Sequence, residues 1–165
     1  MIRAHLACLA TAVLLAAGCT PPRVAPAAMP ADTIAAIALE RGACHGTCPI
    51  YVLQLFEDGR AVFNGERFVR VMGTDSAHVS RDAVAGLQRQ FRERGFTTLP
   101  GVIARGTPRC GPYATDLPTV QLTVRQADAT HRVRFDGGCM DHPLWLDSLA
   151  AMVDSVAGAS RWITR

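Results

Sequence analysis

Four cysteines in the C-terminal part of the chain have the most distinctive chemistry: Cys44, Cys48, Cys110 and Cys139. An even number of cysteines indicates disulfides in an exported protein, and four of them allow three connectivities. Cys44 and Cys48 flank a tight loop in which Gly46 permits a positive φ. Cys110 and Cys139 lie in loops that border one predicted hairpin. We therefore predict Cys44–Cys48 and Cys110–Cys139 disulfides.

Two other uses of these cysteines remain open. Four thiolates can hold zinc, but structural zinc sites prefer short gaps in both pairs, and only one pair here is close. A thiol–disulfide redox protein would use Cys44 and Cys48. Redox pairs usually enclose two residues and open a helix, whereas this pair encloses three and Pro49 leads into a predicted strand. Thiol titration under mild reductant separates a structural disulfide from a catalytic one.

Few other residues have a pattern that predicts chemistry. Asp116 precedes a predicted strand, where it either caps backbone N–H groups or presents a carboxylate toward the cysteine loop. The histidines share no metal-ligand spacing, the serines lie in no nucleophile elbow, and the chain has no phosphate-binding glycine loop. We predict no catalytic residue, metal or cofactor. The candidate binding surface comprises His45, Gly46, Thr47 and Asp116.

The elements that must position these residues begin with strands. Alternating or β-branched residues predict strands over 50–56, 60–64 and 68–72, and the apolar residues 34–40 form either a strand or, given their alanines, a helical turn. Asp58-Gly59 is a strong hairpin signal, and Gly65 permits a bulge. Ser80 is a good N-cap for a helix whose apolar face is Val84, Leu87 and Phe91 and which ends at Gly95.

The second part of the chain repeats this plan after a long irregular stretch at 97–116. Strands are predicted over 120–125 and 131–135, and a helix from Pro143 to Gly158 with Asp141 as a possible cap. Its apolar face comprises Leu146, Leu149, Val153 and Val156. The order strands, helix, strands, helix predicts an α+β fold, with an antiparallel sheet and two amphipathic helices on one face.

The N-terminal segment predicts export and lipid attachment. Arg3 and His5 precede an uncharged apolar run that is too short to span a bilayer, and Ala17-Gly18-Cys19 follows it. We expect residues 1–18 to be a lipoprotein signal peptide, Cys19 to be lipidated, and 19–32 to be a Pro/Ala-rich tether. Residues 33–165 form one domain.

The charge composition of the chain indicates which kinds of partner it can bind. All 17 basic residues are arginine, 14 residues are acidic, and the net charge is +3. So small a charge argues against a nucleic-acid binder. We expect the partner surface to be a membrane reached through Cys19. Because Thr20 is not the Asp that marks inner-membrane retention, we expect the outer membrane, with the domain facing the periplasm.

Two motifs resemble a known family. Cys44-His45-Gly46-Thr47-Cys48-Pro49 with Tyr51 and Asp58-Gly59, together with Thr115-Asp116-Leu117-Pro118-Thr119, resemble the bacterial DUF6438 family, a domain of unknown function. The terminal Ala157-Gly158 with Trp162 also resembles its C-terminus, so the resemblance spans about residues 34–162. The family's members commonly carry lipoprotein signals. The resemblance implies no mechanism, and we expect a binding or structural module of the cell envelope, with the redox protein as the alternative.

Overall fold

The computed structural model describes residues 33–163, so the predicted signal peptide, Cys19 and the tether lie outside the described residues. The strands are β1 (Ile34–Arg41), β2 (Ile50–Phe56), β3 (Arg60–Arg67), β4 (Gly73–His78), β5 (Val102–Ile103), β6 (Thr119–Gln126) and β7 (Thr130–Asp136). The helices are α1 (Arg81–Glu93), a 3-10 turn η1 (Phe96–Thr98), α2 (Trp145–Ala157) and α3 (Ser160–Ile163). None of the helices in this part of the chain is long and apolar enough to cross a membrane.

The strands form one seven-stranded sheet in the order β4-β3-β2-β1-β6-β7-β5. The α+β class and the mostly antiparallel sheet are confirmed. The prediction of a wholly antiparallel sheet is wrong at one edge, because β5 pairs in parallel with β7. This short strand comes after α1 and not after a hairpin turn, so the chain reaches the edge of the sheet already running in the direction of β7.

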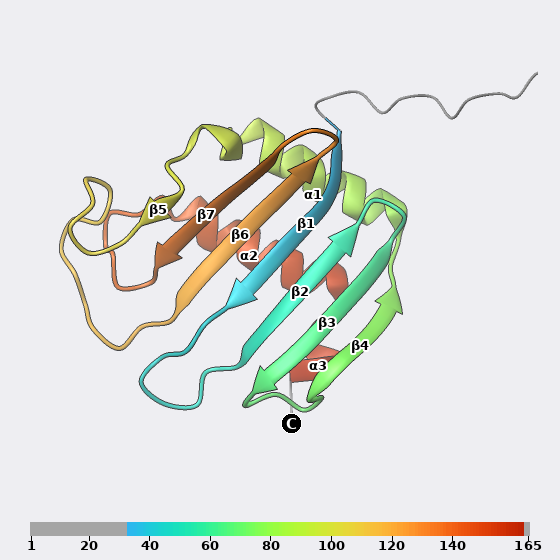
Figure 1. The fold of residues 1–165 in the computed structure, drawn as a ribbon, viewed down its shortest axis with the longest axis horizontal. Helices are drawn as coiled ribbons and strands as arrows, with labels where there is room; N and C mark the ends of the chain where they lie inside the picture. The colour runs from blue at the N-terminus through green and yellow to red at the C-terminus, as the bar shows by residue number, and fades with distance from the viewer. Residues whose placement is uncertain (1–32, 164–165) are drawn as a thin grey trace, which may run out of the picture.

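The two long helices lie on the same side of the sheet, and no element of residues 33–163 covers the other face (Figure 1). Alternation within the strands accounts for this, since successive side chains point to opposite faces. Ile37 and Leu39 of β1, Leu53 and Leu55 of β2, and Leu122 of β6 are fully buried. They belong to the same hydrophobic core as the predicted apolar face of α1, whose Val84, Leu87 and Phe91 are buried as well.

Local signals in the sequence correspond to the turns and caps that form. The β2–β3 hairpin turns at Asp58-Gly59, where Gly59 has a φ of 88°. The Ser80 side chain accepts a hydrogen bond from the backbone N–H of Ala83 at the start of α1. Gly95 and Gly158 both adopt the left-handed conformation that ends a helix.

The prediction of a strand over 68–72 is wrong. Phe68 has a φ of 56°, and the backbone N–H groups of Arg70 and Val71 both donate to the carbonyl of Trp162. The C-terminal helix α3 thus satisfies the polar groups that a neighbouring strand would otherwise engage. The edge strand β4 begins only at Gly73.

The second helix begins later than predicted. Its first residue is Trp145, and no side chain caps its N-terminus, so the proposed role of Asp141 is wrong. The carbonyl of Pro143 instead accepts a bond from the N–H of Leu146, which forms a single tight turn before α2. Leu146, Leu149 and Val153 are buried as predicted, together with Ala150 and Ala157, while Val156 is only partly buried.

The predicted bulge forms at Gly65, where the pairing of β2 with β3 shifts by one residue. A Cβ added there would overlap the carbonyl of Val71 and the side chains of Val69 and Phe63. Gly65→Ala should therefore lower the free energy of unfolding by more than about 2 kcal/mol, measured by urea denaturation.

Gly86 provides the control, because it lies in α1 with only the Arg89 guanidinium near its Cβ position, at 3.7 Å. Gly86→Ala should raise the free energy of unfolding by about 0.5–1 kcal/mol. An unchanged stability in Gly65→Ala would show that the 68–72 segment yields easily and is not fixed by α3.

Candidate functional site

The two sequence motifs meet at one end of the sheet. The backbone N–H of His45 donates to the carbonyl of Asp116 at 3.1 Å, and the N–H of Gly42 donates to the carbonyl of Thr119 at 2.8 Å. His45, Gly46 and Thr47 are exposed between the two cysteines. The predicted binding-surface residues therefore lie together at the end of β1 and the start of β2 and β6.

Asp116 has neither of the two roles that the sequence suggested, which were to cap backbone N–H groups or to present a carboxylate toward the cysteine loop. Its φ is 74°, a left-handed conformation that is uncommon for a residue other than glycine. The carboxylate accepts a hydrogen bond from the Thr115 hydroxyl at 3.0 Å, whereas the backbone carbonyl contacts the cysteine loop. Asp116 therefore joins the two motifs through its backbone, and its side chain stays exposed.

Cys44 and Cys48 lie at disulfide distance, with their Cα atoms 5.8 Å apart. This is the pairing that the sequence predicts. After Cys48 the chain passes through Pro49 into β2, so this pair does not open a helix. The covalent link holds the exposed loop closed and fixes where β2 begins.

A cavity of about 250 Å³ opens beside this loop. Its walls are largely apolar and come from three parts of the chain: Cys48-Pro49, Pro118 and Ile163. Arg41 and Tyr51 supply its polar groups. The cavity thus combines Pro49 and Tyr51 of the first motif with Pro118 of the second.

The polar groups of this cavity form a closed network with α2. The Arg41 guanidinium donates from Nε and Nη2 to Oδ2 of Asp154, at 3.0 and 2.7 Å. The Tyr51 hydroxyl donates to Oδ1 of the same carboxylate at 2.6 Å and accepts a bond from Arg41 Nε at 3.0 Å. Arg41 and Asp154 are about three-quarters buried, so these bonds hold both side chains in one arrangement.

The Tyr51 hydroxyl and the Arg41 guanidinium both stay protonated at neutral pH. Burial raises the pKa of Tyr51 far above its ordinary value of 10.0, and the adjacent Asp154 carboxylate raises it further. Burial alone would lower the pKa of Arg41, but Asp154 and Tyr51 outweigh burial and raise it. Tyr51 is therefore a neutral hydrogen-bond donor and Arg41 a fixed cation, and neither is available as a base.

Sequence reasoning did not identify Arg41 or Asp154, although a signal for both is present. Arg41 is in phase with the buried Ile37 and Leu39 of β1, so it points to the helix side of the sheet. Asp154 lies four residues after the buried Ala150 and three before the buried Ala157, on the same face of α2. A charged residue on a buried face needs a partner of opposite charge, and Arg41 and Asp154 are partners of each other.

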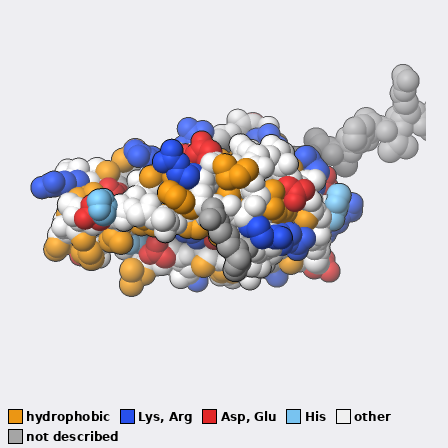
Figure 2. All heavy atoms as spheres, turned by 90° about the horizontal axis from the view of Figure 1, so that it is seen from below, with side chains coloured by type: hydrophobic (Ala, Val, Ile, Leu, Met, Phe, Trp, Pro, Cys, Tyr) orange, Lys and Arg blue, Asp and Glu red, His pale blue; other side chains and the backbone are white. Residues whose placement is uncertain are grey.

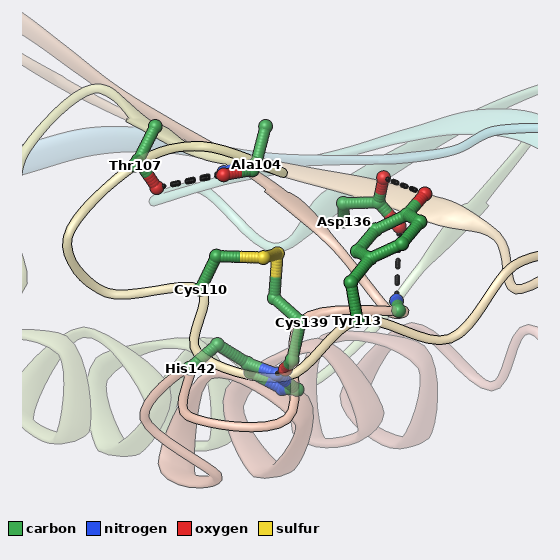
Figure 3. The surroundings of a disulfide bond; sticks show 8 residues. Ala104, Thr107, Cys110, Tyr113, Asp136, Cys139 and His142 are labelled. Atoms are coloured by element: carbon green, nitrogen blue, oxygen red, sulfur yellow. Dashed lines mark hydrogen bonds between the residues drawn. A yellow bond between two sulfur atoms is a disulfide. The ribbon is translucent and has the colours of Figure 1, made fainter.

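The second pair, Cys110 and Cys139, also lies at disulfide distance, with Cα atoms 4.3 Å apart. Figure 3 shows it between the long loop and the segment that follows β7. Both cysteines are buried. Around them, the Tyr113 hydroxyl donates to Asp136 at 2.9 Å and the N–H of Ala114 donates to the carbonyl of Gly138 at 2.9 Å. The predicted irregular stretch is therefore anchored along its length.

His142 lies under this disulfide and was not recognised as important from the sequence. It is buried, stacks on Phe135 with ring centroids 5.3 Å apart, and contacts the carbonyl of Cys139 through Nδ1. Its Nε2 contacts the Asp147 carboxylate at 2.6 Å. Both partners only accept hydrogen bonds, so both ring nitrogens donate, which requires the protonated imidazolium.

The described residues contain no group of three or more His, Cys, Asp or Glu side chains placed to hold a metal ion. At the lower end of the molecule, Figure 2 shows hydrophobic, basic and acidic side chains intermingled, with no large patch of a single charge. The chemistry at this end is therefore that of an apolar cavity with a fixed polar wall.

The two disulfides should differ in their effect on stability. A crosslink restricts the unfolded chain, and its effect grows with the length of the loop that it closes. The sequence separation is 29 residues for Cys110–Cys139 and 4 for Cys44–Cys48. Replacing Cys110 and Cys139 with alanine should cost about 3 kcal/mol of the free energy of unfolding, and replacing Cys44 and Cys48 clearly less. Urea denaturation of both double variants measures this, and an equal or larger loss from the short pair would contradict it.

His142 should make stability depend on pH. Burial lowers its pKa, but the Cys139 carbonyl and Asp147 outweigh burial and raise it above the ordinary value of 6.5. A raised pKa in the folded state stabilises the protein fully below the unfolded pKa, and this contribution is lost as pH rises through the folded pKa. The stability difference between the native protein and His142→Gln should therefore be larger at about pH 5.5 than at about pH 8.5.

Asp147→Asn is the matched control, since it removes the carboxylate and keeps the imidazole. It should lower the pKa of His142, which NMR titration of the ring protons measures. A pH-independent difference between the native protein and His142→Gln would show that the ring acts through packing alone.

Comparison with known proteins places the chain in a family. No curated protein sequence matches the chain, but the model of a family described as a domain of unknown function, DUF6438, matches residues 35–157. The match includes both motifs, Arg41, Tyr51, Asp154 and the two cysteine pairs. Because it covers most of the chain, the protein belongs to the DUF6438 family.

Proposed function

We propose that this protein is a lipid-anchored binding module of the bacterial cell envelope, attached through Cys19 to the outer membrane and facing the periplasm. Its ligand site is the cavity between the two motifs. The observation that carries the proposal is the network of Arg41, Tyr51 and Asp154, whose members already hold one another before any ligand arrives. A preorganised polar wall lowers the entropic cost of binding.

The chemistry of the cavity favours a ligand with an apolar body and one hydrogen-bond acceptor. Its walls are mainly proline, isoleucine and the Cys48 side chain. Within the described residues, Arg41 uses Nε and Nη2 in the network, which leaves Nη1 as a donor for an incoming oxygen. The neutral Tyr51 and the paired Asp154 add no free charge.

Binding is favoured over catalysis by the state of the polar groups. A nucleophile needs a base within hydrogen-bond reach, and the hydroxyl in this cavity is that of Tyr51, which is held as a donor to Asp154. The envelope lipoprotein assignment is supported by the Ala17-Gly18-Cys19 junction after an apolar run.

The alternative, a thiol–disulfide redox protein, has weaker support. A redox thiol needs a lowered pKa, and helix N-termini or neighbouring cations are the usual causes. Cys48 leads instead into β2 through Pro49. Mild reductant distinguishes the two functions, because a structural Cys44–Cys48 bond resists it and a catalytic one opens readily.

Photo-crosslinking in intact cells tests the proposal. Leu117 is 46% exposed next to the cavity residue Pro118, so a benzoylphenylalanine at this position lies at the entrance. The same replacement at Arg89, an exposed residue of α1, is the control. We expect a discrete adduct from position 117 and none from position 89.

Cys19→Ala forms the second arm of the experiment. It should abolish incorporation of labelled palmitate, release the protein from membranes and weaken the adduct from position 117, because several acyl chains are needed for stable anchoring. If Cys19→Ala stays with membranes and the parent chain takes up no palmitate, the anchor is wrong. If neither position gives an adduct, the binding site is wrong.

A further inference from the structure

The uncovered face of the sheet is a second surface with a defined chemistry. Because side chains alternate, the residues between the buried ones point to this face, and the register aligns them in rows across the strands. One row joins Phe56, Ala36 and Arg125, and the next joins Gln54, Ala38 and Thr123. The rows thus combine small, polar, basic and aromatic side chains, and no other helix or strand of residues 33–163 lies over them (Figure 1).

Arginines border this face. Arg132 lies opposite Thr123 and Arg134 opposite Gln121 on the neighbouring strand. Arg125 is diagonal to Arg132 and carries its guanidinium 5.9 Å from the centre of the Phe56 ring. All three arginines are exposed, and none forms an ion pair within residues 33–163.

Two acidic residues of the same face, Glu40 and Asp136, reduce its positive charge but do not cancel it. Glu40 accepts a hydrogen bond from the Gln121 amide at 2.9 Å. Asp136 accepts bonds from the Tyr113 hydroxyl and from the backbone N–H of Gly138. Three exposed arginines face these two carboxylates, so this part of the face keeps a net positive charge, and no ion pair between the two groups is present within residues 33–163.

Two hollows lie end to end on this face along β1. One, of about 130 Å³, includes Ala36, Ala38 and Arg125, and the other, of about 280 Å³, includes Glu40, Gly42 and Arg134. The path from Ala36 to Gly42 covers six residue steps, about 20 Å in a strand. That length accommodates an extended chain of about six residues.

We propose that this groove along β1 binds an extended acidic segment of another envelope protein. Alternate side chains of such a segment would place carboxylates on Arg125, Arg132 and Arg134 and apolar groups on Ala36 and Ala38. Arginine presents a planar fork that binds carboxylates in two-point contacts. This inference does not depend on the cavity described above, and it rests on the proposed envelope location only for the source of the segment.

Other occupants fit the face less well. A glycan usually stacks on an exposed aromatic ring, but the Arg60 guanidinium covers Phe56 at 3.9 Å. A second copy of the chain would place arginines against arginines. The Pro/Ala-rich stretch at 20–31 contains one charged residue, Arg23, and no carboxylate, so it is not the acidic segment.

A synthetic peptide of alternating glutamate and valine, about eight residues long, tests the proposal on the full-length chain by fluorescence anisotropy. Its counterpart with glutamine in place of glutamate should not bind. The double variant Arg132→Gln, Arg134→Gln should bind the acidic peptide about tenfold more weakly, since it loses two charge-assisted contacts.

Two matched variants separate the groove from bulk charge. Arg89→Gln, Arg94→Gln removes the same charge from exposed positions at α1 and should leave binding unchanged. Ala38→Trp fills the floor and keeps every arginine, so it should also weaken binding, with circular dichroism to verify its fold. Equal weakening by the α1 variant, no binding of the acidic peptide, or tighter binding of dextran sulfate through the same arginines would each overturn the proposal.

Discussion

Strand β1 is hydrogen-bonded on both sides, to β2 along one edge and to β6 along the other. The two hairpins of the chain do not touch each other directly in the sheet, so β1 is the element that joins them. Its inward residues Ile37 and Leu39 are fully buried under the helices, while Ala36 and Ala38 lie on the open face. The placement of the two hairpins, the candidate site and the open face depends on β1 lying at the centre of the sheet.

The candidate site follows from where β1 ends. Its last residue, Arg41, is in phase with the buried positions and therefore carries a charge to the helix side at the edge of the core. Burying an unpaired guanidinium there would be costly, and Asp154 of α2 and Tyr51 of β2 neutralise and bond it. One network thus connects the central strand, its neighbour and the helix that covers them, and it also forms the polar wall of the cavity.

The sequence predicted the features that depend on neighbouring residues. The Asp58-Gly59 turn, the Ser80 cap, the left-handed glycines and the buried face of α1 each follow from a few adjacent positions. What it could not predict depends on distant partners. The 68–72 segment is not a strand because its N–H groups donate to the carbonyl of Trp162. Arg41 pairs with Asp154, which lies 113 residues away in the sequence. The same holds for β5, whose parallel partner β7 comes later in the chain.

The two motifs form one structural unit, in which some residues shape the loops and others line the cavity. The Cys44–Cys48 link and the left-handed Asp116 shape two loops, and the bond from His45 N–H to the Asp116 carbonyl locks them together. Pro49 and Pro118 lead into β2 and β6, the strands on either side of β1, and both line the cavity. Tyr51 alone among the motif residues contributes a buried polar group, and it does so with two residues outside the motifs. The motifs therefore determine the shape of the cavity. Its positively charged group comes from Arg41, which lies at the end of β1.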